Sequence, residues 1–221
     1  MKAFLLAAGK GKRLLPLTKD IPKPLVKVGG ISLIERNLYN LKKANVLEVI
    51  INIHHLGEKI INLLGDGSKY GLKISYSIEG QLLGTGGGIQ KSIHEFADPF
   101  IVLSSDIWTD FDFSGLKLKR NLLAHMVLVP NTSSNPEGDV SLINGFVKEK
   151  QPSEHYTFSG ISIVSPKLFN YPNDRELGLW SEILKPASEK GLVSGELYKG
   201  KFENLNTIDD IERLDASLSA E

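Results

Sequence analysis

Apolar runs that end in glycine or polar residues dominate the first half of the chain. One continuous run covers residues 2–8 and stops at Gly9, and similar runs cover 46–53 and 99–106. Continuous apolar runs of this length are typical of strands that are covered on both faces of a parallel sheet. The alternation of apolar and polar residues over 72–78 predicts a further strand.

Segments with helical spacing separate these strands. Ser32 can cap a helix over 32–43, with Glu35 completing a capping box. Helices are also expected over 56–65 and, after a glycine-rich entry, over 84–96. The alternation of strands and helices predicts an α/β fold with a Rossmann-like, doubly wound sheet that is mixed but mostly parallel.

Shorter elements follow in the second half of the chain. We expect a helix near 180–190, a last helix starting at Thr207, and strands over 124–130, 140–145, 157–164 and 192–198. Repeats, low-complexity tracts and linkers are absent from the sequence. A single domain over 1–221 is therefore predicted, made of two halves, 1–110 and 111–221.

Composition narrows the classes of partner. Lysine plus arginine and aspartate plus glutamate both number 26, so no global field attracts nucleic acid or an anionic membrane. The absence of cysteine excludes disulfides and thiolate zinc sites and is compatible with a reducing cytosol. The apolar stretch near the N-terminus is too short to span a bilayer. We expect a soluble, cytoplasmic protein that binds neither nucleic acid nor membrane, as a monomer or a homodimer.

One loop departs from this even charge balance. The stretch "LAAGKGKRLLPLTKDIPKPL" holds a single acid and the cations Lys10, Lys12, Arg13, Lys19 and Lys23. Consecutive amides around Gly9 and Gly11 can form a concave nest for phosphate oxygens. The two prolines that flank Lys23 fix the backbone on both sides of it. The loop is therefore a candidate anion site.

The longer stretch "LAAGKGKRLLPLTKDIPKPLVKVGG" resembles the signature of the sugar-1-phosphate nucleotidyltransferases, A-A-G-x-G-x-R followed by P-x-T and P-K-P. Such enzymes transfer a nucleotidyl group from an NTP to a sugar 1-phosphate and release pyrophosphate. The resemblance implies a glycosyltransferase-A-like nucleotidyltransferase fold. It also explains the cations, because two phosphate-bearing substrates must approach each other.

The resemblance assigns roles to the residues of the loop and of the first strands. Arg13 would stabilise charge on the α-phosphate and pyrophosphate, and Lys23 would hold the α-phosphate or the sugar phosphate. Asp106, at the carboxyl end of a buried strand, would bind Mg²⁺ or Mn²⁺. The first half would therefore bind the nucleotide, through Leu6, Ala7, Ala8, Gly9, Gly11, Glu79, Gly84 and Thr85.

Base and sugar selection are less closely defined. Glu79 lies in "EGQLLGTGGG", which resembles the base-reading segment of the family, and a carboxylate accepts from uracil N3–H and equally from guanine. The second half would bind the sugar. Its candidate contacts are Gly138, Asp139, Glu149 and Gly160, the last in "FSGIS".

One segment departs from the family pattern. Where the family has x-D-x-G-T, this chain has "FENLNT", with Asn204 in place of the second metal carboxylate and Asn206 in place of glycine. Asn204 can offer an oxygen to the metal but no charge, so we expect weaker metal binding. The departure raises the alternative of a catalytically impaired regulator that binds sugar nucleotides.

Over nearly its full length the chain resembles the short uridylyltransferases of cell-wall recycling, which act on N-acetylmuramic acid 1-phosphate. Mannose-1-phosphate guanylyltransferases share most of the motifs and stay an alternative. Retention of Arg13, Lys23 and Asp106 favours an active enzyme over a regulator.

Overall fold

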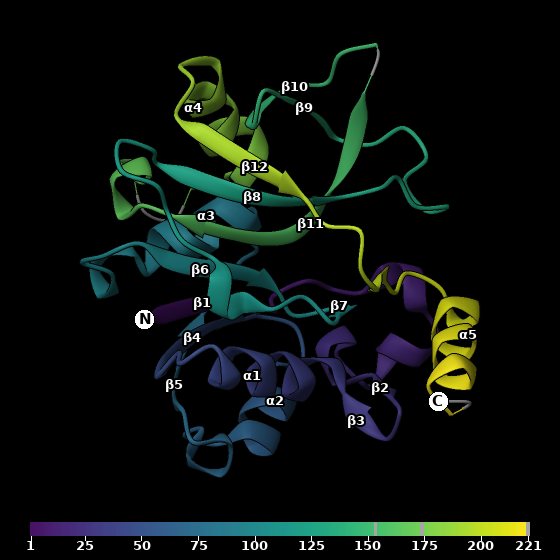
Figure 1. The fold of residues 1–221 in the computed structure, drawn as a ribbon. Helices are drawn as coiled ribbons and strands as arrows, with labels where there is room; N and C mark the ends of the chain where they lie inside the picture. The colour runs from purple at the N-terminus through teal and green to yellow at the C-terminus, as the bar shows by residue number, and fades with distance from the viewer. Residues whose placement is uncertain (153, 173–174, 220–221) are drawn as a thin grey trace.

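A nine-stranded sheet runs through the molecule (Figure 1), and the computed structural model describes residues 1–152, 154–172 and 175–219. Its strand order is β5-β4-β1-β6-β11-β8-β12-β10-β9. The first four strands in this order are β5 (Lys73–Ile78), β4 (Glu48–Ile53), β1 (Lys2–Leu6) and β6 (Phe100–Ser104). They are parallel to one another, as predicted for the first half.

Helices cover both faces of this parallel part. The helices α1 (Leu33–Lys43) and α2 (Gly57–Leu64) pack with Leu5 of β1, and α3 (Gly84–Lys91) packs with Phe4 on the opposite face (Figure 1). Adjacent residues of a strand point to opposite faces, so the apolar run of β1 serves both cores. The predicted capping box of α1 is confirmed. The helix predicted over 84–96 ends earlier, and a short 3₁₀ turn covers Ile93–Glu95.

The prediction of a mostly parallel sheet is wrong for the second half. Here β11 (His155–Val164) is antiparallel to β6 and to β8 (Ala124–Val129), and β10 (Phe146–Glu149) is antiparallel to β9 (Val140–Ile143) and β12 (Val193–Leu197). Only β8 and β12 are parallel among the described strands of this half. Asn144 and Gly145 join β9 to β10 with φ values of 52° and 79°. Such a two-residue turn can connect only antiparallel strands.

The strands of the second half also close on themselves. The first residues of β11 pair with β9, which stands at the far end of the strand order. Strand β11 thus pairs with both β8 and β9. Its register against β8 shifts between Phe158 and Ile161, where Gly160 has a φ of 80°. The result is an α/β domain in which an open parallel sheet continues into a small mixed barrel.

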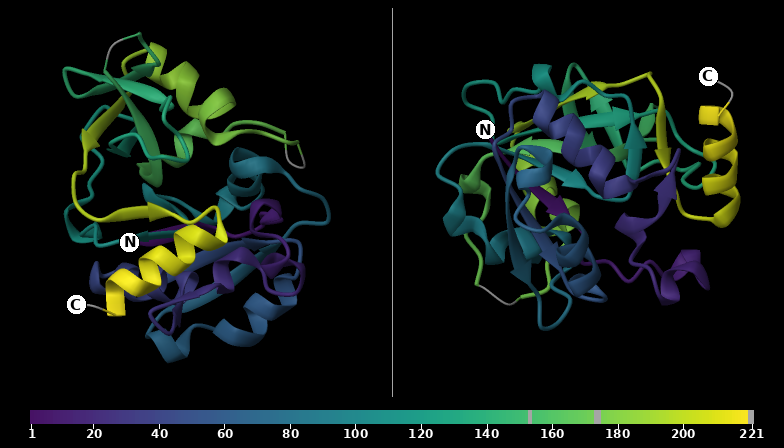
Figure 2. Two further views of the ribbon diagram at one scale, coloured as in Figure 1. Left: turned by 90° about the vertical axis from the view of Figure 1, so that its right-hand side faces the viewer. Right: turned by 90° about the horizontal axis from the view of Figure 1, so that it is seen from below.

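Two small two-stranded sheets lie outside the nine-stranded sheet. The strand β7 (Ile107–Thr109) pairs with β13 (Phe202–Asn204), and β2 (Lys27–Val28) pairs with β3 (Ile31–Ser32). The π-helix Leu179–Leu184 leads into α4 (Lys185–Glu189). The last helix, α5 (Ile208–Ser219), lies at the edge of the molecule (Figure 2).

Helix α5 is docked to the first half of the chain. Its Leu214 belongs to a cluster with Val28, Leu33 and Trp108, and its Asp215 carboxylate accepts from the Gly29 amide at 2.6 Å. The C-terminal segment is therefore held against β2 and β3. Within the described ranges, none of the helices is long and apolar enough to cross a membrane.

The capping box of α1 leads to the first prediction. Burial alone would raise the pKa of Glu35, but hydrogen bonds from Ser32 and Tyr70 outweigh it and lower that pKa. We expect Glu35→Ala to reduce the free energy of unfolding at neutral pH by about 1–3 kcal/mol, whereas Glu58→Ala, in the first turn of α2, has little effect. Denaturant unfolding measures the difference.

The lowered pKa of Glu35 also predicts how the effect of Glu35→Ala on stability depends on pH. A carboxyl whose pKa is lowered by folding contributes stability above its ordinary pKa and loses that contribution as the pH falls through the lowered value. The gap between wild type and Glu35→Ala should therefore narrow under acid conditions. A gap that stays constant down to the acid limit of folding would contradict this origin.

Candidate active site

The basic loop folds into a compact series of 3₁₀ turns, Lys12–Leu14, Leu17–Lys19 and Lys23–Leu25. Gly11, with a φ of 61°, begins the first turn, and its carbonyl accepts from the Thr18 hydroxyl at 2.8 Å. A Cβ at Gly11 would lie only 3.0 Å from Thr18 Cγ2 and 3.2 Å from Lys23 Cβ. Glycine therefore allows the two ends of the loop to meet.

A cavity of about 420 Å³ lies against this loop. Its wall combines cations of the loop with the ends of β1 and β6. The lining residues are Leu6, Ala7, Gly9, Lys10, Gly11, Lys12, Arg13, Leu14, Lys23, Pro24, Leu82, Ser105 and Asp106. The fold thus brings seven of the residues proposed from the sequence into one place, namely Leu6, Ala7, Gly9, Gly11, Arg13, Lys23 and Asp106.

Two further cavities adjoin the first and share Leu6 and Asp106 with it. One has a volume of about 290 Å³ and adds Ala8, Asn52, Glu79, Gly84, Thr85, Ser104 and Glu176. The other has a volume of about 210 Å³ and adds Ile107, Phe158, Ser159, Gly160, Leu179, Trp180 and Asn204. Asp106 therefore stands where a cationic cavity meets two others.

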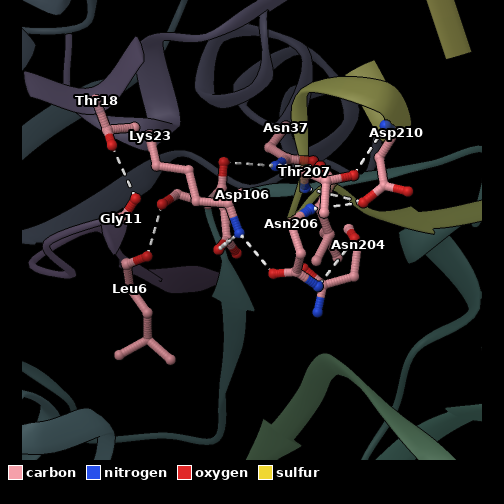
Figure 3. Close-up of polar contacts among 12 residues, drawn as sticks. Leu6, Gly11, Thr18, Lys23, Asn37, Asp106, Asn204, Asn206, Thr207 and Asp210 are labelled. Atoms are coloured by element: carbon pink, nitrogen blue, oxygen red, sulfur yellow. Dashed lines mark hydrogen bonds and ion pairs between the residues drawn. The ribbon is translucent and has the colours of Figure 1, made fainter. Parts of the chain in front are cut away.

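Lys23 and Asp106 form a tight ion pair at this junction (Figure 3). The Lys23 ammonium lies 2.6 Å from Asp106 Oδ2 and 3.3 Å from Asn206 Oδ1. Lys23 is only 7 % exposed, whereas the Asp106 side chain is 31 % exposed and open to the cavities. A buried ammonium needs such partners, because its desolvation is costly.

Two side chains, those of Ser105 and Asn37, hold the backbone around Asp106 in place. The Ser105 hydroxyl donates to the Leu6 carbonyl at 2.6 Å. The Asn37 amide of α1 donates to the Ser105 and Ile107 carbonyls at 3.4 and 3.2 Å. The turn that carries Asp106 is thus tied to β1 and to α1.

A buried pair connects the phosphate loop with the predicted base-reading residue. The side-chain oxygen of Asn52, Oδ1, accepts from the Ala7 backbone amide at 2.8 Å. The side-chain nitrogen of Asn52, Nδ2, donates to Glu79 Oε1 at 2.7 Å. The other Glu79 oxygen accepts from the Leu83 amide at 3.1 Å. A Cβ at Gly88 would lie 2.6 Å from both side chains, so glycine there makes room for the pair.

The glycine-rich start of α3 is shaped by the segment opposite it. Gly84 has a φ of 71°, and a Cβ there would lie 2.6 Å from the Leu177 carbonyl oxygen. The Thr85 hydroxyl accepts from the Leu179 amide at 2.8 Å. Close packing against residues 177–179 therefore explains why glycine and threonine stand at positions 84 and 85. Gly84 and Thr85 also line the cavity beside Glu79.

Asn204 supplies the second oxygen of a candidate metal site. Strand pairing places Asn204 opposite Ile107, next to Asp106, and its buried Oδ1 has no hydrogen-bond partner among the described residues. An unpaired buried oxygen beside a carboxylate suits a hard cation such as Mg²⁺. The described part of the chain has no cluster of three or more His, Cys, Asp or Glu side chains. A cation held by Asp106 and Asn204 would take its remaining ligands from water or substrate.

The candidate sugar residues divide into two groups. Gly160 lines the smallest cavity, and a Cβ there would lie 2.6 Å from Ser104 Oγ. Asp139 accepts from the Phe158 amide at 2.8 Å and so acts on a residue that lines this cavity. Gly138 packs against Asn131, and Glu149 pairs with Lys185 at 2.6 Å. Among the described lining residues of the three cavities, Gly138, Asp139 and Glu149 do not occur.

Several lining residues were missed from the sequence, among them Asn52, Leu82, Ser104, Phe158 and Trp180. The contact of Asn206 with Lys23 was missed as well. Asn52 and Ser104 could have been found, since both are polar residues near the carboxyl ends of apolar strands. Trp180 packs against the core and also lines a cavity.

A cation-lined cavity at the carboxyl ends of parallel strands suits a protein that binds phosphate groups. Residues 2–134 match the nucleotidyl transferase family, and the chain belongs to this family. The family resemblance found in the sequence is thereby confirmed.

The relatives give the same class. The chain is 37 % identical to an N-acetylmuramate alpha-1-phosphate uridylyltransferase of Neisseria meningitidis, with 94 % of each chain covered. It is 31 % identical to a D-glycero-alpha-D-manno-heptose 1-phosphate guanylyltransferase of Campylobacter jejuni, with 95 % of this chain and 96 % of the other covered.

The fold is also similar to a solved structure of HddC from Yersinia pseudotuberculosis in complex with GMP-PN. The TM-score is 0.81 at 22 % identity, with 98 % of this chain and 99 % of the other covered.

Asn52 offers a test of the buried pair. Asn52→Ala leaves the Ala7 amide and a Glu79 oxygen without their partner, so we expect nucleotide affinity to fall by roughly tenfold and stability by about 1–3 kcal/mol. The exposed Asn62→Ala is the control. Calorimetric titration with nucleotide measures the effect, and equal affinities of the two variants would contradict the proposed link.

Proposed function

We propose that this protein transfers a uridylyl group from UTP to a sugar 1-phosphate, N-acetylmuramic acid 1-phosphate, and releases pyrophosphate. The observation that carries the proposal is the Lys23–Asp106 pair at the junction of a cationic cavity with two others. The Neisseria meningitidis relative, similar over almost the whole chain, supports this base and sugar. The sugar substrate would connect the enzyme with recycling of cell-wall peptidoglycan.

The reaction needs charge neutralisation more than a covalent nucleophile. An oxygen of the sugar phosphate attacks the α-phosphorus, and the bond from that phosphorus to the pyrophosphate oxygen breaks. In our proposal the backbone around Gly9 and Gly11 cradles the phosphates, and Arg13 faces the leaving pyrophosphate. Lys23 holds the phosphate at which the bond changes. All of these residues line the cationic cavity.

Asp106 and Asn204 would hold the divalent metal, Mg²⁺ or Mn²⁺. Bound there, the cation would withdraw charge from the α-phosphate. Asp106 Oδ2 accepts from Lys23, and the carboxylate retains lone pairs with which it could bind a metal. We further propose a cytoplasmic location, on the absence of cysteine and the nature of the nucleotide substrate.

The proposal divides the two remaining cavities between base and sugar. Glu79, with Gly84 and Thr85, would contact the base, since a carboxylate that accepts two hydrogen bonds still has lone pairs for a third. The sugar would enter the cavity of Gly160, Phe158 and Trp180. The halves 1–110 and 111–221 would thus serve nucleotide and sugar respectively.

A guanylyltransferase is the second candidate, because Glu79 can accept from guanine as well as from uracil. The test is pyrophosphate release from UTP, GTP, CTP and dTTP, each paired with a panel of sugar 1-phosphates. We expect turnover with UTP and N-acetylmuramic acid 1-phosphate. Turnover confined to GTP would replace the proposal with the second candidate, and nucleotide binding without turnover would favour a regulator.

Arg13 tests the charge argument in the same assay. Arg13→Ala should lower kcat by roughly a hundredfold or more, because charge on the α-phosphate and pyrophosphate loses its partner. Arg120→Ala, which removes an exposed cation that lines none of the three cavities described above, is the matched control. Equal rates for the two variants would contradict the assigned role.

Asn204 tests the metal site. Asn204→Asp adds a carboxylate beside Asp106, so the Mg²⁺ concentration for half-maximal activity should fall by roughly tenfold. Titration of Mn²⁺ followed by its electron paramagnetic resonance signal gives a second readout without turnover. If neither midpoint moves, Asn204 is not a metal ligand.

A further inference from the structure

Two acceptors of different charge hold the Lys23 ammonium. Asp106 provides a carboxylate oxygen at 2.6 Å, and Asn206 provides a neutral amide oxygen at 3.3 Å. Asn206 is only 4 % exposed, and its contact with Lys23 is buried. The contact joins residues that are 183 positions apart in the chain.

The amide of Asn206 is fixed in orientation. Its Nδ2 donates to the Asn204 carbonyl at 3.1 Å, which turns Oδ1 toward Lys23 (Figure 3). Its backbone amide donates to Asp210 Oδ2 at 3.1 Å. A side chain held at both amide atoms is an oriented acceptor that needs no rearrangement to hold an ammonium.

Charge distinguishes the two acceptors of Lys23. A carboxylate cancels the positive charge of the ammonium, whereas an amide oxygen holds the ammonium and leaves its charge available to a phosphate. Asp106 is also exposed to three cavities and has other partners in the proposed reaction. Once Asp106 turns to such a partner, Asn206 keeps Lys23 in place.

We infer that Asn206 is a positioning residue, which holds the Lys23 ammonium at the site of phosphate transfer. The kinetic consequence rests on the proposed function, but the contact itself does not. The glycine found at this position in the family pattern could not make it. The inference therefore assigns a role to the residue by which this chain departs from that pattern.

The contact is tested first without turnover. The ¹⁵N–¹H resonance of the Lys23 ammonium, assigned by its loss in Lys23→Met, should be visible in the wild type because the group is buried and hydrogen-bonded. In Asn206→Ala the exchange of its protons with water should accelerate by roughly tenfold. Asn206→Ser, whose side chain is too short to reach Lys23, gives the same comparison if Asn206→Ala does not fold.

Thr207→Ala is the matched control. The Thr207 hydroxyl accepts from the Asp210 amide at 3.1 Å, so the variant weakens the start of α5 and leaves the Asn206 side chain intact. It should lower the unfolding temperature without changing the Lys23 resonance. A merely structural role of Asn206 predicts the same resonance behaviour in both variants.

Steady-state kinetics provide a second test of the role of Asn206. Asn206→Ala should lower kcat by roughly 10- to 100-fold, with the KM for nucleotide changed less than the kcat, because the ammonium is misplaced for transfer. Asn206→Asp retains an acceptor for Lys23 and should restore both the resonance and part of the kcat.

The outcomes are separable. A Lys23 resonance that is unchanged in Asn206→Ala, or changed equally by Thr207→Ala, overturns the inference whatever the activity. A changed resonance with an unchanged kcat also overturns it. Absence of turnover in the wild type on every substrate pair would defeat the proposed function, and the resonance would still decide whether Asn206 holds Lys23.

Discussion

The burial of one ammonium group holds distant parts of this protein together. Lys23 reaches Asp106 across 83 positions and Asn206 across 183. Because a buried charge without partners is strongly unfavourable, loss of either contact would destabilise the packing of the basic loop against the end of β6 and the segment before α5. The docking of α5 on β2 and β3 holds the segment that carries Asn206 next to the basic loop.

The cavities lie where the sheet changes character. Parallel strands β1 and β6 end at Leu6 and Ser104, and the next strand, β11, is antiparallel and bends at Gly160 beside Ser104. Open α/β sheets bind ligands at the carboxyl ends of their strands, where neighbouring connections diverge. Here the divergence separates the parallel half from the barrel, so the proposed nucleotide and sugar regions meet at Asp106.

Local signals in the sequence predicted most of the parallel half. Apolar runs, the Ser32 capping box and the cationic loop depend on neighbours in the chain, and the structure has each of them. The strand directions of the second half were misjudged, although Asn144 and Gly145 are a strong signal for a hairpin of antiparallel strands. The contacts of Asn52 and Asn206 depend on residues far away in sequence, which no local pattern encodes.

Two neutral amide side chains shape the electrostatics of the site. Asp106 is already balanced by Lys23, and Asn204 and Asn206 add oxygen atoms without charge. The cations Lys10, Lys12 and Arg13 of the adjoining cavity therefore dominate the local charge, which favours anions over a bare divalent cation. A metal bound there would need the charge and the oxygens of the nucleotide phosphates, so nucleotide and metal would bind as one unit.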